Sequence, residues 1–124
     1  MMRSAQVVRA ILTIGLWVGV GAVQGEESPS KIAFNRDIRP ILSDRCFVCH
    51  GPDRANRQAD LRLDRRDEAV ASAITVGDSK ASELIRRLTC EDEEERMPPA
   101  DSKKSPLTKK EVELLARWID EGAE

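Results

Sequence analysis

The feature that most constrains this chain is a pair of cysteines followed at once by a histidine. Cys46, Cys49 and His50 follow the pattern C-x-x-C-H. His50 is the one histidine of the sequence, and Met97 is the one methionine beyond the first two residues. At the C-x-x-C-H spacing, two thiols attach covalently to a haem while the adjacent imidazole ligates its iron. Histidine with methionine is a known pair of axial haem ligands, so the chain offers one candidate for each position.

Other interpretations of the same residues stay open at this point. A thioredoxin-like redox pair is expected at the start of a helix within a βαβ pattern, whereas these cysteines follow a predicted helix. A zinc site would add Cys90 to the three motif residues, but Cys49 and His50 are neighbours and would have to share one tetrahedral metal. A disulfide between Cys46 and Cys49 would close a small, strained loop. The haem interpretation is preferred, with Met97 as the second ligand or as ordinary core packing.

The first 25 residues have the pattern of a secretory signal peptide, with cleavage near Gly25. Arg3 and Arg9 give a positive start, and residues 10–23 are an almost unbroken apolar run. This run is shorter than the roughly 17 to 25 residues of a membrane-spanning helix. Cleavage is therefore preferred over an uncleaved anchor, with no stable membrane insertion afterwards. The expected location is the periplasm or another exported compartment.

Residues 26–33 predict a polar tether, and residues 34–124 predict one small domain. A domain of this size is marginal on its own apolar surface and often uses a metal, disulfides or another staple. A buried haem would supply the missing bulk. Three cysteines cannot all pair within one exported chain, which leaves Cys90 as a free thiol or as a partner in an intermolecular disulfide. The formal net charge of −2 at pH 7 argues against nucleic acid as a partner.

Apolar periodicity predicts that a first helix leads directly into the cysteines. The apolar residues between 34 and 42 recur at helical spacing, and Asn35 is the expected N-cap. Pro40 lies too deep for an ideal helix starting at Asn35, so we expect a loose first turn and a regular helix from about Pro40. This amphipathic helix would deliver its C-terminal end to Cys46.

The rest of the chain also predicts helices and no sheet. A short helix is expected at residues 67–74, and another after an N-cap at Asp78. The C-terminal helix is the best specified, because Thr108 and Glu111 form a capping box before it and Gly122 follows its apolar stripe. The predicted fold class is therefore all-α.

Met97 stands between an acidic run and two prolines. We interpret the acidic run, residues 91–95, as a solvated loop. Pro98 restricts Met97 to an extended conformation, and a stiff loop is able to hold a weakly binding thioether on iron. Arg96 is a candidate partner for a haem propionate, and Trp118 is expected to pack the last helix against the first helix or the haem.

These features together resemble a small cytochrome c domain of the planctomycete type. The resemblance rests on residues 34–42, 46–52, 61–64, 82–85, 96–99 and 114–123. It implies a cytochrome c-like fold in which the N-terminal helix ends in the C-x-x-C-H motif and short helices precede a C-terminal helix. It further implies one covalent haem c on Cys46 and Cys49, with His50 as the proximal and Met97 as the distal iron ligand.

The same resemblance implies transfer of single electrons rather than enzyme catalysis. The partners would be the cytochrome c maturation machinery and an unidentified redox protein. Two other functions stay open: a haem-based sensor or ligand-binding module with a labile Met97 bond, and a zinc- or haem-stapled structural domain of a larger exported protein. Carbon monoxide binding separates the first from an electron carrier, and metal analysis with an absorbance spectrum separates the second.

Overall fold

A computed structural model describes residues 30–124, so the predicted signal peptide and the start of the tether lie outside the described residues. The described chain forms four α-helices and two short turns of other helix types. They are η1 (Phe34–Ile38, a π-helical turn), α1 (Arg39–Arg45), α2 (Arg66–Ser72), α3 (Glu83–Thr89), η2 (Ala100–Ser102, a 3-10 turn) and α4 (Lys109–Asp120). Residues 30–124 contain no strand, and the predicted all-α fold is confirmed. Among these helices, none has the length and apolar character needed to cross a bilayer.

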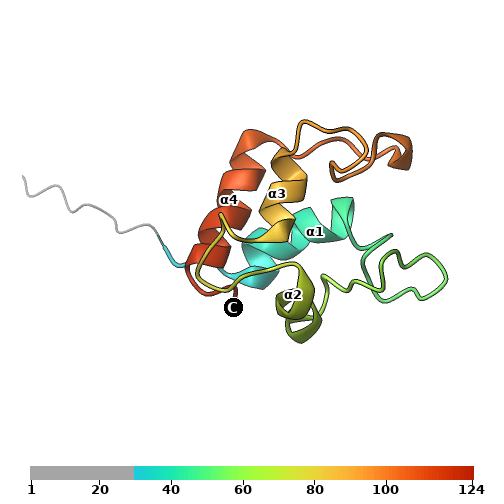
Figure 1. The fold of residues 1–124 in the computed structure, drawn as a ribbon. Helices are drawn as coiled ribbons and strands as arrows, with labels where there is room; N and C mark the ends of the chain where they lie inside the picture. The colour runs from blue at the N-terminus through green and yellow to red at the C-terminus, as the bar shows by residue number, and fades with distance from the viewer. Residues whose placement is uncertain (1–29) are drawn as a thin grey trace, which may run out of the picture.

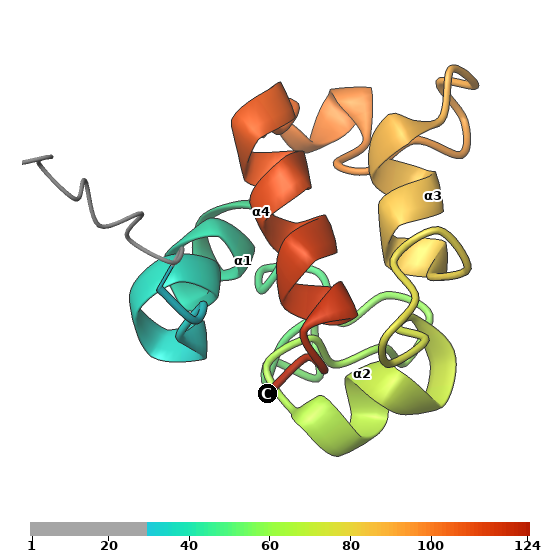
Figure 2. The ribbon, with the colours of Figure 1, turned by 90° about the vertical axis from the view of Figure 1, so that its left-hand side faces the viewer.

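Helix α4 is the central element of the fold. It packs against η1 on one side and α3 on the other (Figure 1). Figure 2 shows α4 between these two elements, with α2 near its C-terminal end. Ile38 of η1, Leu42 of α1 and Leu115 of α4 are almost fully buried in the shared core. The Trp118 ring lies 5.6 Å from the ring of Phe34, which confirms that Trp118 packs the last helix against the first helical segment.

Both ends of α4 are as predicted. The Glu111 amide donates to the Thr108 hydroxyl at 3.2 Å and the Thr108 amide donates to the Glu111 carboxylate at 2.7 Å, which is the reciprocal capping box. Gly122 follows the helix with a φ of +110°. The amides of Gly122 and Ala123 donate back to the carbonyls of Ile119 and Trp118, as in a Schellman motif.

The predicted N-cap at Asn35 is wrong. The helical segment begins at Phe34, and its cap is Ala33. The Asp37 carboxylate accepts a hydrogen bond from the Ala33 amide at 2.8 Å, while the Asp37 amide donates to the Ala33 carbonyl at the same distance. Asp37 thus binds the amide of the cap residue itself, whereas Asn35 as N-cap would have accepted from an amide two or three residues after it. The regular helix α1 begins at Arg39 with Pro40 in its first turn, close to the predicted position.

The predicted N-cap at Asp78 is also wrong, because α3 begins only at Glu83 with Ser82 as its N-cap. The Asp78 carboxylate instead accepts from the Ala81 amide at 3.0 Å and closes a separate turn before the helix. The buried Ser82 hydroxyl donates to the Asp78 carbonyl at 2.8 Å and fixes that turn against the helix start. Helix α2 ends at Ser72, two residues before the predicted end.

Candidate functional site

Three sequence-predicted residues, two from the C-x-x-C-H motif and one far from it along the chain, line one cavity of about 330 Å³. They are Cys46 with its thiol, His50 with its imidazole and Met97 with its thioether. Leucine and alanine side chains supply much of the remaining wall. The full lining is Cys46, His50, Ala59, Leu61, Leu63, Ser72, Ala73, Glu83, Leu84, Arg87, Leu88 and Met97. Cys49 is half-buried and is not part of this lining.

The C-x-x-C-H motif forms a tight turn directly after α1. The Cys46 amide continues the helix by donating to the Leu42 carbonyl at 2.8 Å, and the His50 amide donates to the Cys46 carbonyl at 2.7 Å. The chain leaves this turn at the buried Gly51. A Cβ atom at position 51 would lie 2.2 Å from the Phe47 carbonyl oxygen, so the turn requires glycine there. The first helix and this glycine together fix the path of the motif.

The His50 ring is oriented by a backbone carbonyl. Its Nδ1 lies 3.2 Å from the Gln58 carbonyl oxygen, and because a carbonyl only accepts, this contact places the proton on Nδ1 and leaves Nε2 free for a metal. Burial lowers the pKa of His50, against a smaller raising effect of the Gln58 hydrogen bond. The net lowering favours the neutral imidazole, which is the form that ligates metals.

Two further main-chain hydrogen bonds hold the loop that follows His50. The Gln58 amide donates to the Cys49 carbonyl at 2.7 Å, and the Leu63 amide donates to the His50 carbonyl at 2.9 Å. The carbonyl that orients the imidazole was not identifiable from the sequence. No residue type marks Gln58 as the acceptor, because the group involved is its backbone.

Met97 belongs to the loop between α3 and η2 and lines the same cavity. Its amide donates to the Arg87 carbonyl near the end of α3 at 2.9 Å. Pro98 is buried, and the Met97–Pro98 peptide bond is cis. The acidic run before it is exposed from residue 91 to residue 94, as expected for a solvated loop.

Residues 46–101 match the family model described as Planctomycete cytochrome C. The predicted family is confirmed over this segment. The match begins at the first cysteine of the motif and includes His50 and Met97. Comparisons with curated proteins and with solved structures give no match. The family model indicates a c-type cytochrome, which carries its haem covalently.

The residues of this cavity fit a haem c. Apolar walls suit a flat macrocycle, and the donor groups are a thiol, an imidazole and a thioether, which are ligand and attachment types of c-type haems. Burial raises the pKa of the Cys46 thiol to about 12, so this thiol is protonated at neutral pH. When bound, haem supplies an iron that accepts and releases one electron.

The other interpretations of the motif gain no geometric support. Cys46, Cys49 and Cys90 are all free thiols. Within residues 30–124, no group of three or more histidine, cysteine, aspartate or glutamate side chains is placed to hold a metal ion. Cys90 directly follows α3 and is half-buried there. The zinc site that would have used all three cysteines is therefore not assembled.

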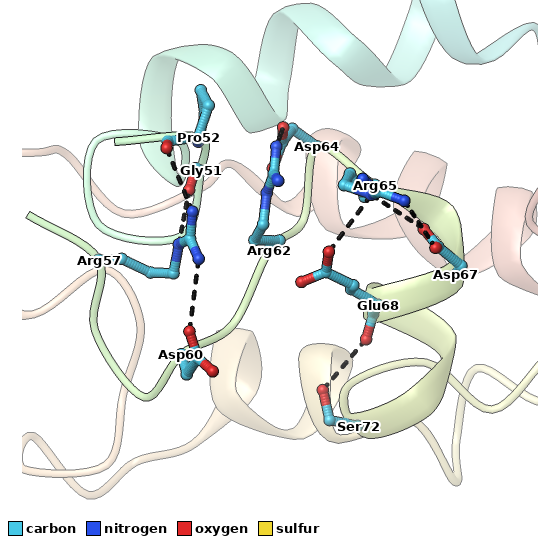
Figure 3. Close-up of polar contacts among 10 residues, drawn as sticks. All are labelled: Gly51, Pro52, Arg57, Asp60, Arg62, Asp64, Arg65, Asp67, Glu68 and Ser72. Carbon is cyan, nitrogen blue, oxygen red and sulfur yellow. Dashed lines mark hydrogen bonds and ion pairs between the residues drawn. The ribbon is translucent and has the colours of Figure 1, made fainter. Parts of the chain in front are cut away.

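The Arg57 side chain holds the loop on the His50 side of the cavity through hydrogen bonds and an ion pair. Its guanidinium donates to the carbonyls of Gly51 and Pro52 at 3.0 and 3.1 Å and pairs with Asp60 at 3.4 Å (Figure 3). The side chain is only 11% exposed. Ala59 and Asp60 both have positive φ angles, which reverse the chain towards Leu61. Sequence reasoning did not identify Arg57, because nothing in the local pattern separates it from the neighbouring arginines.

A second hollow of about 660 Å³ lies along the same loop and has a charged lining. Its lining is Arg54, Arg57, Asp60, Arg62, Arg65 and Glu68. Arg62 pairs with Asp64 at 2.6 Å and Arg65 pairs with Asp67 at 2.9 Å (Figure 3). The lining has four arginines and two carboxylates, and Asp64 and Asp67 outside the lining pair with two of the arginines. The hollow is larger than the haem cavity but has none of the haem donor groups, and its ion pairs brace the loop.

The arginine at the haem cavity is Arg87 rather than Arg96. Arg96 lies 3.9 Å from Glu93 and is not part of the cavity lining. Arg87 lines the cavity together with Glu83, and its Nε donates to the Glu83 carboxylate at 2.7 Å. Sequence reasoning missed both residues. Glu83 and Arg87 are four residues apart, so they lie on the same face of α3, next to the cavity residue Leu84. This spacing was the available signal.

Proposed function

We propose that this protein is an exported monohaem c-type cytochrome that carries single electrons. The observation that supports this most directly is the meeting of Cys46, His50 and Met97 in one largely apolar cavity. Covalent attachment would proceed through thioethers to Cys46 and Cys49. The family match supports the haem, and the geometry of the cavity supports the choice of ligands.

His50 is the proposed proximal ligand through Nε2. Its Nδ1 hydrogen bond to Gln58 holds the ring orientation and increases the basicity of the ligating nitrogen. Met97 is the proposed distal ligand. A thioether is a soft donor that raises the reduction potential of haem iron. With both axial positions taken, the iron offers no open position for substrate, so the protein tunes electron transfer and catalyses no bond rearrangement.

The N-terminal signal pattern supports export, since residues 1–25 have a positive start, an apolar run and a small-residue end. Export also places the protein where cytochrome c maturation machinery attaches haem. A covalent cofactor suits such a protein because it is not lost by dilution. Its electron donor and acceptor would be other proteins of the same compartment.

The direct test is to produce the whole chain together with a cytochrome c maturation system. We expect a denatured mass that includes one haem and a pyridine haemochrome spectrum of the c type. Cys46→Ser and Cys49→Ser should each reduce covalent haem, whereas the matched variant Cys90→Ser should retain it in full. A protein of apo mass, or equal haem loss in all three variants, would overturn the proposal.

The distal ligand is tested separately with Met97→Ala. This variant should lose the weak red absorption band of ferric histidine–methionine haem and should bind carbon monoxide rapidly in the ferrous state. The wild-type protein should bind carbon monoxide slowly without denaturant. If the band persists in the variant, Met97 is not the ligand. If the wild type binds carbon monoxide rapidly, the sensor or ligand-binding function is favoured instead.

A further inference from the structure

We propose that Arg87 is a positioning residue that holds the Met97 loop against α3 and so keeps the Met97 thioether on the haem iron. The inference rests on the proposed histidine–methionine ligation. It assigns to one arginine a task that the prolines after Met97 were expected to perform. Arg87 acts through the loop backbone and needs no contact with the iron itself.

Arg87 holds the loop at two points. Its own carbonyl accepts the Met97 amide at 2.9 Å, and its Nη1 donates to the Glu95 carbonyl at 3.2 Å. The two loop residues, Glu95 and Met97, flank Arg96. Both hydrogen bonds therefore fall within three consecutive residues that end at the proposed ligand. The other main-chain hydrogen bonds of this stretch, from the amides of Glu95 and Arg96 to the Asp92 carbonyl, stay within the loop. They shape the loop but do not attach it to α3.

Glu83 fixes the direction of the Arg87 side chain. The Glu83 carboxylate lies one helical turn before Arg87 and accepts from its Nε at 2.7 Å. This leaves Nη1 directed at the Glu95 carbonyl. A guanidinium with a rigid fork is suited to such a double task, because one planar group binds a carboxylate and a carbonyl at the same time. Both Glu83 and Arg87 line the haem cavity, so this contact lies beside the proposed ligand.

The neighbouring Arg86 provides a matched comparison within the same network. It also pairs with Glu83, at 2.7 Å, and it also reaches Glu95, but there it binds the side-chain carboxylate at 2.6 Å. Arg86 is exposed and is not part of the cavity lining. The two arginines thus share both partners but differ in exposure and in what they bind on Glu95. Of the two, only Arg87 donates a hydrogen bond to the backbone of the loop that carries Met97.

The test uses the haem-loaded whole chain and compares Arg87→Ala with Arg86→Ala. Both variants remove one arginine from Glu83, so a merely structural role predicts equal losses in each. We expect Arg87→Ala to weaken the red ferric band and to speed carbon monoxide binding to ferrous haem by about tenfold or more. Arg86→Ala should keep both properties near wild type. The reduction potential of Arg87→Ala should fall, because thioether ligation raises it.

Two further variants keep the inference open to refutation. Arg87→Leu retains a good helix former and an apolar stem, and it replaces the alanine variant if that one does not fold. It should show the same loss, and Arg87→Lys should restore part of it. Wild-type spectra and carbon monoxide rates in both Arg87→Ala and Arg87→Leu would overturn the inference, as would equal losses in Arg86→Ala. A wild-type protein without the red band would instead overturn the proposed ligation, and the positioning role with it.

Discussion

The two loops that bring candidate iron ligands to the cavity are held in different ways. The His50 loop is fastened mainly by its own backbone, through hydrogen bonds from the amides of Gln58 and Leu63 and from the imidazole Nδ1. The Met97 loop is joined to α3 by one amide and by arginine side chains. Backbone hydrogen bonds survive most substitutions, whereas side-chain braces do not. The position of His50 is thus set mainly by the backbone, whereas the position of Met97 depends on side chains that substitution can change.

The most severe way to break the His50 loop is to fill the space at Gly51. In Gly51→Ala the new Cβ would lie 2.2 Å from the Phe47 carbonyl oxygen, and a backbone atom within a hydrogen-bonded turn has little room to move. We expect a loss of about 3 kcal/mol, at the upper end for overpacking. Urea denaturation of the haem-loaded protein measures it. Gly77→Ala is the control, because its φ of +81° is strained for alanine but its surroundings are open, and it should lose only about 1 kcal/mol.

Equal losses in the two glycine variants would show that the contact with Phe47 costs no more than the strained φ at Gly77. The comparison of loops would then lose its main support on the His50 side.

Removing the Arg57 clamp should have an intermediate effect. Arg57→Ala leaves the carbonyls of Gly51 and Pro52 without their guanidinium donor, and we expect a loss of about 1.5 kcal/mol in urea denaturation. Arg54→Ala, on an exposed residue of the same loop, should change stability by less than about 0.5 kcal/mol. Because the loop backbone still holds His50, the red band should stay close to wild type. A band lost in Arg57→Ala would contradict the view that backbone contacts suffice on this side.

The sequence predicted well wherever a structure depends on near neighbours. The capping box of Thr108 and Glu111 and the glycine stop at Gly122 are complete within a few residues, so their patterns determine the outcome. Asn35 and Asp78 were misplaced because each lies near a helix start without being its cap. The first segment begins one residue before Asn35, where Asp37 binds the Ala33 amide, and Asp78 closes a separate turn before α3.

The family and the cavity residues on the motif were also predictable, but their supports were not. The group that orients His50 is the backbone carbonyl of Gln58. Every residue type has this carbonyl, so no sequence pattern predicts it. Arg87 was missed for a different reason. The sequence offered several arginines near Met97. The position of Arg87 depends on the phase of α3, which begins later than predicted, whereas Arg96 lies in the loop after α3 and outside the cavity lining.

The smallest expected effect concerns the acid sensitivity of the Met97 side. The arginines beside Glu83, first Arg86 and then Arg87, lower the pKa of its carboxyl from 4.5 to about 2. A carboxyl with a lowered folded-state pKa stabilises the fold above its unfolded pKa of 4.5, and this contribution is lost as the pH falls through 2. The free energy of unfolding, measured with urea, should therefore fall less between pH 6 and pH 3 in Glu83→Gln than in the wild type. The change is small because exposed ion pairs contribute little.

The matched control for Glu83→Gln is Asp37→Asn on the opposite side of the fold. The pKa of Asp37 is also lowered to about 2, mainly by its hydrogen bonds with Arg36 and the Ala33 amide, so its removal should flatten the same pH profile. The two variants should differ at pH 7. Glu83→Gln should slightly weaken the red band because the Arg87 side chain loses the carboxylate that orients it, whereas Asp37→Asn should leave the band unchanged. If both variants weaken the band equally, the band reports general stability and the Met97 loop has no side-chain brace of its own.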